Sequence, residues 1–116
     1  MEIGQHRIID LYDCVNADKS QEVITKFFFN ALKKSNFTVI SEHCHEFEPQ
    51  GLSGVYVLAE SHFTFHIWVE YNFVSIDVYW CGKSCDDDNL ISLILDFFKP
   101  KRMESHFIKR GIGLSI

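Results

Sequence analysis

The chain has 116 residues, 47% of them hydrophobic and 15% aromatic, and a formal net charge of −5. This length and composition are typical of one globular domain with a sizeable core, here residues 1–116, and they exclude a disordered chain. The acidic balance without a basic stripe excludes a protein that binds the phosphate backbone of nucleic acids.

The first predicted element is a strand over residues 6–14, HRIIDLYDC, because Ile, Leu and Tyr favour strands. The polar run after it supplies turn residues and a helix cap expected at Asp18. A helix is predicted over residues 20–34, where apolar residues recur at three- and four-residue spacing and Phe29 lies off the stripe. The residues of this stripe are Val23, Ile24, Phe27, Phe28, Ala31 and Leu32.

The rest of the chain is predicted to form four more strands, a second helix and a short closing strand. Strand character resumes over residues 35–47 and is broken at Pro49-Gln50-Gly51. The acidic run at residues 86–89 begins the second helix, and Pro100 ends it. A short closing strand is expected at residues 104–110, before a loosely held tail, GIGLSI. The three remaining strands are expected at residues 53–60, 63–70 and 73–81, and the inward face of the second helix comprises Leu90, Ile91, Ile94, Leu95 and Phe98.

This order of elements predicts an α+β fold, a two-layer sandwich in which a mostly antiparallel sheet has two helices packed on one face. The other face of the sheet is then uncovered. The chain has no export-signal layout and no apolar stretch near the ~20 residues of a membrane span, so we expect a soluble cytoplasmic protein without a membrane partner. In that compartment the cysteines are expected to be free thiols. They are Cys14, Cys44, Cys81 and Cys85.

Side-chain alternation predicts what the uncovered face carries, because successive residues of a strand point to opposite sides of the sheet. Phe63, Phe65 and Ile67 share one side and point toward the helices. The polar sets of the two neighbouring strands then share the uncovered face. That surface is predicted to hold His66, Trp68, Glu70, Asp77 and Cys81.

A serine next to a histidine, Ser61-His62, lies within the otherwise strand-like run LAESHFTFHIWVEY. Nucleophilic catalysis is one interpretation of this pair. A hydrolase with a nucleophile elbow needs G-x-S-x-G, however, and the GLSG run that contains Ser53 lacks one residue of that spacing. A metal site is also disfavoured, because Cys81 and Cys85 have no second pair of closely spaced ligands.

The string GLSGVYVLAESHFTFHIWVEYNFVSIDVYWCG resembles the core signature of the bacterial and archaeal S-adenosylmethionine decarboxylase proenzymes. The serine-histidine pair, the H-x-W-x-E-Y run and the D-V-x-x-C-G run occur in the family's order. The likeness extends upstream through HRIIDLYDC and the FEPQG turn, and it covers residues 6–82. The resemblance implies a self-processing enzyme that depends on a pyruvoyl group and requires no metal.

The resemblance implies cleavage between Glu60 and Ser61, into a β chain of residues 1–60 and an α chain of residues 61–116. The Ser61 hydroxyl would attack the Glu60 carbonyl, and β-elimination of the resulting ester would leave a dehydroalanine that hydrolyses to the pyruvoyl group. The pyruvoyl carbonyl would form a Schiff base with the substrate amine and act as the electron sink that pyridoxal phosphate supplies elsewhere.

The resemblance also assigns roles to other residues. Ser53 and His66 match residues that assist self-cleavage, the histidine by removing the Cα proton during elimination. Cys81 matches the residue that returns a proton to the substrate carbon after carbon dioxide leaves.

The predicted substrate is S-adenosylmethionine, whose decarboxylated form is the aminopropyl donor for spermidine synthesis. Phe47 and Trp68 match aromatic residues that lie against the adenine and the sulfonium, and Glu70 matches the acceptor for the ribose hydroxyls. The resemblance implies a homodimer with sites at or near its interface. Two alternatives remain: a pyruvoyl-dependent decarboxylase of ornithine or arginine, and a non-catalytic homologue that acts as a regulatory partner.

Overall fold

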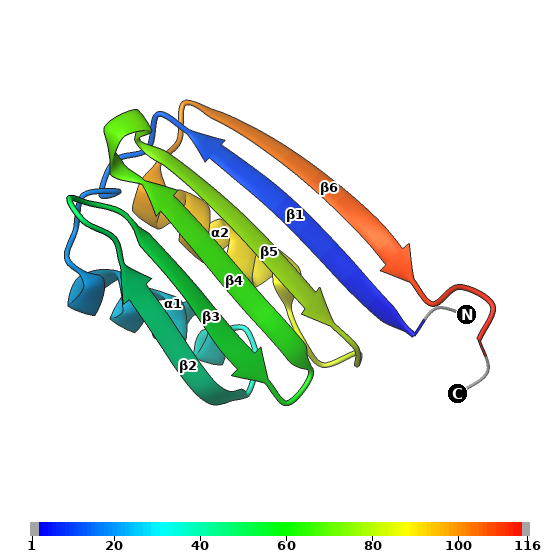
Figure 1. The fold of residues 1–116 in the computed structure, drawn as a ribbon. Helices are drawn as coiled ribbons and strands as arrows, with labels where there is room; N and C mark the ends of the chain where they lie inside the picture. Colours follow the sequence, from blue (N-terminus) through cyan, green and yellow to red (C-terminus); the bar gives the residue numbers. More distant parts are fainter. Residues whose placement is uncertain (1–2, 115–116) are drawn as a thin grey trace.

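The computed structural model describes residues 3–114, which form a six-stranded sheet with two helices. Strand order is β2-β3-β4-β5-β1-β6, and all five neighbouring pairs are antiparallel. Both helices lie behind the same face of the sheet (Figure 1), so the predicted α+β sandwich is confirmed. The elements are β1 (Gly4–Tyr12), α1 (Gln21–Lys34), β2 (Val39–Glu46), β3 (Leu52–Leu58), β4 (Ser61–Trp68), the 3-10 helix η1 (Val69–Tyr71), β5 (Phe73–Trp80), α2 (Asp87–Phe98) and β6 (Arg102–Arg110).

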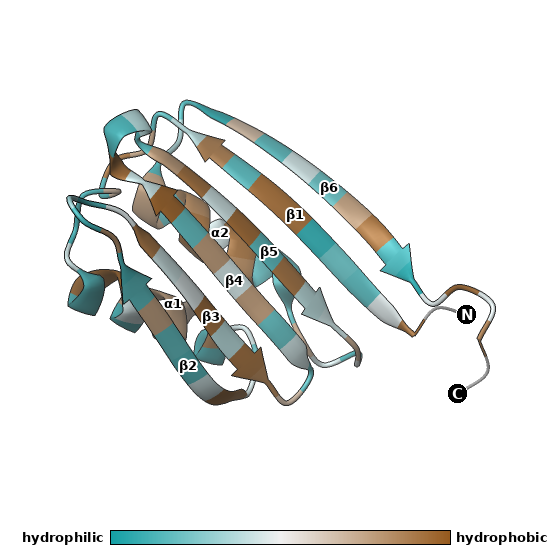
Figure 2. Cartoon of the chain, in the orientation of Figure 1, coloured by the Kyte–Doolittle hydropathy of each residue, from teal (hydrophilic) through white to brown (hydrophobic). Residues whose placement is uncertain are grey.

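The core lies between the helices and the covered face of the sheet. Hydrophobic and hydrophilic residues alternate along the central strands (Figure 2), as a sheet with one covered face requires. Phe28 of α1 is fully buried at the centre, with ring centroids 4.5 Å from Phe65 and 5.2 Å from Phe63 of β4. Gly54 of β3 lies opposite Phe65, and a Cβ there would come within 2.2 Å of that ring. The glycine therefore lets a large aromatic side chain fill the core.

The start of α1 differs from the prediction. Ser20 is the N-cap instead of Asp18, and its Oγ accepts a hydrogen bond from the backbone N–H of Val23 at 3.2 Å. Val23 was expected in the buried stripe but is 45% exposed, because the helix packs through a narrower stripe. The residues buried on that stripe are Ile24, Phe28, Ala31 and Leu32.

Helix α2 begins and ends as the sequence indicates. The Asp86 side chain caps it by accepting from the N–H of Asn89 at 3.0 Å, and Lys99, with φ of 42°, ends it. Arg7 of β1 also pairs with Asp87 in the first turn, at 2.5 Å. This ion pair ties the N-terminus of α2 to the sheet.

Several predicted strand boundaries were wrong. Strand β4 starts two residues earlier and ends two residues earlier than expected, because residues 69–71 turn into η1. Strand β3 ends at Leu58, so Glu60 lies in the turn before β4. Strand β1 runs from residue 4 to residue 12 instead of 6–14, and β6 starts two residues before the predicted closing strand. In the predicted tail, residues 115–116 lie outside the described residues.

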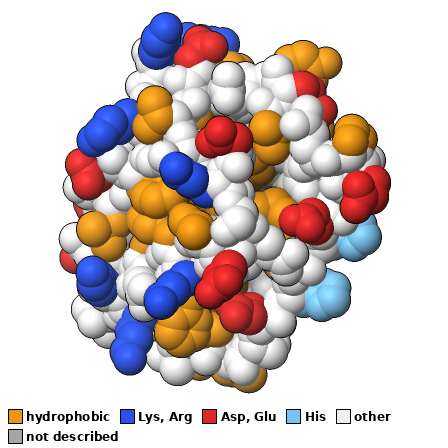
Figure 3. Space-filling model, turned by 90° about the vertical axis from the view of Figure 1, so that its left-hand side faces the viewer, with side chains coloured by type: hydrophobic (Ala, Val, Ile, Leu, Met, Phe, Trp, Pro, Cys, Tyr) orange, Lys and Arg blue, Asp and Glu red, His pale blue; other side chains and the backbone are white. Residues whose placement is uncertain are grey.

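The surface seen from the left-hand side of Figure 1 mixes both signs of charge with apolar side chains (Figure 3). Several large apolar side chains are exposed elsewhere on the molecule, among them Trp68 at 42% and Val57 at 44%. Within residues 3–114, neither helix has the length and apolar character needed to cross a membrane.

We expect Phe28→Ala to lower the free energy of unfolding by about 3–5 kcal/mol, because it leaves a cavity between α1 and β4. Phe29→Ala is the matched control, since Phe29 is 37% exposed on the same helix and its removal should cost under about 1 kcal/mol. Urea denaturation at one protein concentration measures both. Equal losses would contradict this view of the core.

Candidate active site

The Glu60–Ser61 bond lies in the tight turn that joins β3 to β4. The carbonyl oxygen of Glu60 accepts a hydrogen bond from the backbone N–H of Cys81 at 3.0 Å, and the Cys81 Sγ lies 3.5 Å from the same oxygen. The Glu60 carboxylate accepts from the N–H of Thr38 at 3.0 Å, which anchors the turn to the start of β2. Two donors therefore polarise the carbonyl of the bond that the sequence predicts to break.

Ser61 itself has an unusual backbone. Its φ is 155°, in a region that residues with a Cβ seldom occupy. The residue is partly exposed and pairs across the ladder with Trp80 at the end of β5. A reactive hydroxyl thus lies at a strained turn, next to a polarised carbonyl.

A second group of predicted site residues lies near the opposite end of β4. Ser53 of β3 and His66 of β4 are cross-strand partners, and the Ser53 Oγ is 2.6 Å from the His66 Nδ1. The ring centroid of Trp68 is 5.9 Å from that of His66. A cavity of about 490 Å³ adjoins them, and the residues that line it are Phe47, Gln50, Gly51, Leu52, Ser53, His66, Ile67, Trp68 and Glu70.

The structure therefore does not bring all predicted site residues together within one chain. Five strand positions separate Ser61 from His66, which corresponds to about 16 Å at ~3.3 Å per residue. Cys81 lies after the end of β5, and Glu70 lies in η1. The side-chain alternation of a strand, which was used to place both residues on the uncovered face, therefore does not apply to either of them. The predicted side of the sheet is confirmed for His66 and Asp77, which alternate with buried neighbours along β4 and β5.

Sequence reasoning missed a cluster on the uncovered face that joins three strands. His6 of β1, His62 of β4 and Asp77 of β5 have their side-chain ligand atoms within 4.8 Å of one another. Alternation places His62 and Asp77 on this face. His6 could not be added, because the sequence does not indicate that β1 inserts beside β5.

The four cysteines are free thiols in different environments. Burial raises the pKa of the Cys14 thiol to about 11, with Asp13 raising it further and a backbone hydrogen bond at Val74 opposing the shift. Burial, with smaller effects from Glu60, Cys81 and Asp87, raises the pKa of Cys85 to about 11. Cys81 is exposed and its Sγ contacts the Glu60 carbonyl oxygen. Among residues 3–114, Cys81 is the only cysteine whose thiol contacts the Glu60–Ser61 peptide bond.

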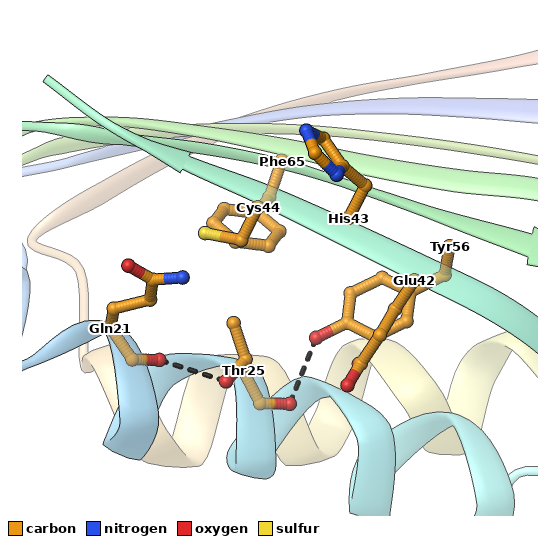
Figure 4. Close-up of a pocket in the computed structure, with 7 residues that line it drawn as sticks. All are labelled: Gln21, Thr25, Glu42, His43, Cys44, Tyr56 and Phe65. Carbon is orange, nitrogen blue, oxygen red and sulfur yellow. Dashed lines mark hydrogen bonds between the residues drawn. The ribbon is translucent and has the colours of Figure 1, made fainter.

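Another hollow lies between β2 and α1 (Figure 4), away from both groups. The Tyr56 hydroxyl donates to the carbonyl of Thr25 at 2.8 Å, which fills its hydrogen-bonding needs. Burial raises the pKa of the Cys44 thiol, and Glu46 and Glu42 raise it further, so that thiol stays protonated at neutral pH. The hollow contains none of the predicted site residues.

Comparison with known proteins supports the sequence resemblance. A family model described as S-adenosylmethionine decarboxylase matches residues 5–111. The chain is 39% identical over 112 residues to the S-adenosylmethionine decarboxylase proenzyme of Methanococcus vannielii, covering 96% of this chain and 92% of that protein. It is 40% identical over 112 residues to the proenzyme of the same name from Thermodesulfovibrio yellowstonii, covering 95% of this chain and 82% of that protein.

The fold has a close structural counterpart. The crystal structure of the adenosylmethionine decarboxylase from Aquifex aeolicus VF5 superposes with a TM-score of 0.88 at 35% sequence identity. The match covers 99% of this chain and 96% of that chain. The similarity therefore includes all elements from β1 to β6.

At about pH 7.5 we expect iodoacetamide to modify Cys81 at least ~10-fold faster than Cys14, because burial and a raised pKa leave Cys14 with little thiolate. Peptide mass spectrometry after short exposures measures both rates. Labelling in urea is the control, since unfolding should make the rates similar. Faster labelling of Cys14 in the folded protein would contradict the thiol environments described above.

Proposed function

The chain belongs to the S-adenosylmethionine decarboxylase family, and on this premise we propose that it cleaves itself between Glu60 and Ser61 and decarboxylates S-adenosylmethionine. The product would serve as the aminopropyl donor for spermidine synthesis, in the cytoplasm. The relatives' names support this substrate over ornithine or arginine, and a catalytic role over a regulatory one. The whole chain, residues 1–116, acts as one domain before cleavage.

The observation that carries the cleavage proposal is the contact between Cys81 and the Glu60 carbonyl. A hydroxyl that attacks an amide carbonyl places negative charge on its oxygen, and an N–H at 3.0 Å stabilises that charge. Ser61 supplies the attacking hydroxyl from the next residue. Its strained φ is relieved when the turn is cut, which favours cleavage at this bond.

The pyruvoyl group that cleavage would create from Ser61 supplies an electron-withdrawing ketone for decarboxylation. The surroundings of Ser61 fit such a group, because the residue is partly exposed at the end of β4 and has a thiol beside it. Cys81 is suited to return a proton to the substrate carbon. No metal is needed for this role.

The cavity at the other end of β4 fits the remainder of the substrate. Phe47 and Trp68 are 46% and 42% exposed, and such aromatic surfaces suit an adenine ring and a sulfonium cation. Glu70 lines the same cavity and is placed to accept hydrogen bonds from ribose hydroxyls. A cavity of about 490 Å³ lies within the range that ligands of this size occupy.

The separation between the two groups of residues favours a homodimer. Two chains would pack with their uncovered sheet faces against each other, related by a two-fold axis that lies between the faces and runs perpendicular to the strands. Because this axis reverses the strand direction, the Ser61 end of β4 in one chain would lie over the His66 end of β4 in its partner. Ser53 and His66 of one chain would then assist elimination at Ser61 of the other. Two equivalent composite sites result, and the partly apolar face that includes Trp68 and Val57 is covered.

If the protein cleaves itself, we expect mass spectrometry of the purified protein to find two fragments, residues 1–60 and 61–116. The second fragment should begin with a ketone in place of an amine. Ser61→Ala should remain a single chain of 13.5 kDa that releases no carbon dioxide from S-adenosylmethionine. An active preparation with an intact wild-type chain would sink the proposal.

The composite site predicts complementation between two inactive variants. His66→Ala should cleave poorly by itself, and Ser61→Ala cannot be cut. Co-expression of the two with different tags should restore cleavage of the His66→Ala chain, because a mixed dimer contains one intact pairing of Ser61 with His66. Failure of the mixed dimer to cleave, once its formation has been verified by tag purification, would argue against a site shared between chains.

A further inference from the structure

We propose that His62 is the general base that removes the Ser61 hydroxyl proton in the first step of self-cleavage, and that Asp77, His6 and Arg110 hold it in the tautomer that does so. The inference rests on the proposed self-cleavage. It assigns a catalytic role to the histidine that follows the scissile serine, a residue that neither the substrate cavity nor the elimination step uses.

The geometry of the Ser61-His62 pair is unusual for a strand. Neighbouring residues of a strand normally point to opposite faces, so a hydroxyl does not meet the side chain that follows it. Ser61, at the first position of β4, has a φ of 155°, outside the usual range for a strand residue. Its Oγ lies 3.4 Å from the Nδ1 of His62, within reach of a proton transfer after a small adjustment.

Three residues from other strands determine the protonation pattern around His62. Arg110 of β6 donates from Nη1 to the Nδ1 of His6 at 3.0 Å, and a guanidinium has no acceptor. His6 therefore carries its proton on Nε2, which donates to Asp77 Oδ1 at 2.8 Å. The same carboxylate oxygen lies 3.6 Å from the Nε2 of His62.

This arrangement favours one tautomer of His62. A proton on Nε2 faces the Asp77 carboxylate and leaves the Nδ1 lone pair directed at the Ser61 hydroxyl. The carboxylate also stabilises the imidazolium that forms when the proton is taken up. The order hydroxyl, imidazole, carboxylate is the one that activates serine nucleophiles on unrelated folds.

A divalent metal ion held by His6, His62 and Asp77 is the competing interpretation of this cluster. Binding a metal through the Nε2 of His6 would move its proton to Nδ1, where the Arg110 guanidinium already donates. Two donors would then face each other. The hydrogen bonds therefore favour the proton chain over a metal site.

The chemical step balances within the chain. The proton of Ser61 Oγ passes to His62 Nδ1, and Oγ bonds to the carbonyl carbon of Glu60. Negative charge on the carbonyl oxygen is stabilised by the N–H of Cys81. The carbon–nitrogen bond then breaks, and the leaving nitrogen takes the proton back from His62 as the amine forms. The product is an ester that the later elimination consumes.

The test is the first-order cleavage rate of pulse-labelled chain made by cell-free translation, followed on gels across pH. Hydroxylamine is added in parallel, because it cuts an ester and so detects the product of the first step. His62→Gln should cleave at least about 100-fold more slowly than wild type, the scale of a lost general base, and should gain no hydroxylamine-sensitive bond. His43→Gln on β2 is the matched control and should cleave at the wild-type rate.

Two further measurements distinguish a general base from a residue with only a structural role. The titratable and charged groups that face His62 are Asp77 and Tyr79 from β5 and His6 from β1, with Arg110 of β6 behind His6. Asp77→Asn removes the carboxylate that faces the Nε2 of His62 and so weakens the preference for the tautomer with a free Nδ1. The plateau of the cleavage rate should therefore fall. Exogenous imidazole should restore cleavage to His62→Ala in part.

Each outcome decides between specific alternatives. Suppose that the wild-type chain cleaves. If His62→Gln then cleaves as fast as wild type, or accumulates an ester that hydroxylamine cuts, the proposed role of His62 is overturned, but the proposed self-cleavage is not. An uncut wild-type chain overturns both proposals. If His62→Gln fails to fold by circular dichroism, the Asp77→Asn rate decides, and a plateau at the wild-type level overturns the inference. Cleavage that chelators abolish and added metal restores favours the metal interpretation.

Discussion

The length and stiffness of β4 are the constraint on which the rest of the site depends. This central strand is hydrogen-bonded to β3 on one side and β5 on the other along its whole length, so its two ends cannot approach each other. Ser61 opens it and Trp68 closes it. The Glu60–Ser61 turn and the cavity lined by Trp68 are therefore held at a fixed separation by one rigid element. This separation is the reason for proposing a site shared with a second chain, which would pack through the uncovered face of the sheet.

The turn before β4 concentrates the features on which the proposed cleavage of one peptide bond rests. The Glu60 carbonyl is held from the far side by the residue that follows β5, its carboxylate is anchored at the start of β2, and Ser61 has a φ that few residues with a Cβ adopt. The core beneath supports this turn, because Phe28, Phe63 and Phe65 lock the first half of β4 against α1. Strain at a functional turn persists only where the surrounding structure holds it.

The uncovered face carries two groups of polar side chains, one near each end of β4. Near Ser61, Arg110 of the edge strand β6, His6 and Asp77 form a hydrogen-bonded chain, and the Asp77 carboxylate lies 3.6 Å from the Nε2 of His62. Toward the other end, the Ser53–His66 pair and the exposed ring of Trp68 face the cavity. An exposed sheet face usually needs only polar residues for solubility. Here the polar residues are instead arranged in contacts that cross strands, and under the proposed homodimer, covering this face would also assemble the site.

Local sequence pattern was enough to predict the fold class, both helices, and the side of the sheet on which His66 and Asp77 lie, because alternation and helical periodicity are properties of neighbouring residues. The motif also singled out Ser61 as the candidate for self-cleavage, which stays a prediction. Register and strand order were not predictable, since the pairing of β1 with β5 joins segments about seventy positions apart, as His6 with Tyr79 shows. Only the tertiary structure therefore decided that Ser61 and His66 lie at opposite ends of one strand and that His6 reaches Asp77. Contacts between distant segments depend on how the whole core packs, and no short stretch of the chain contains that information.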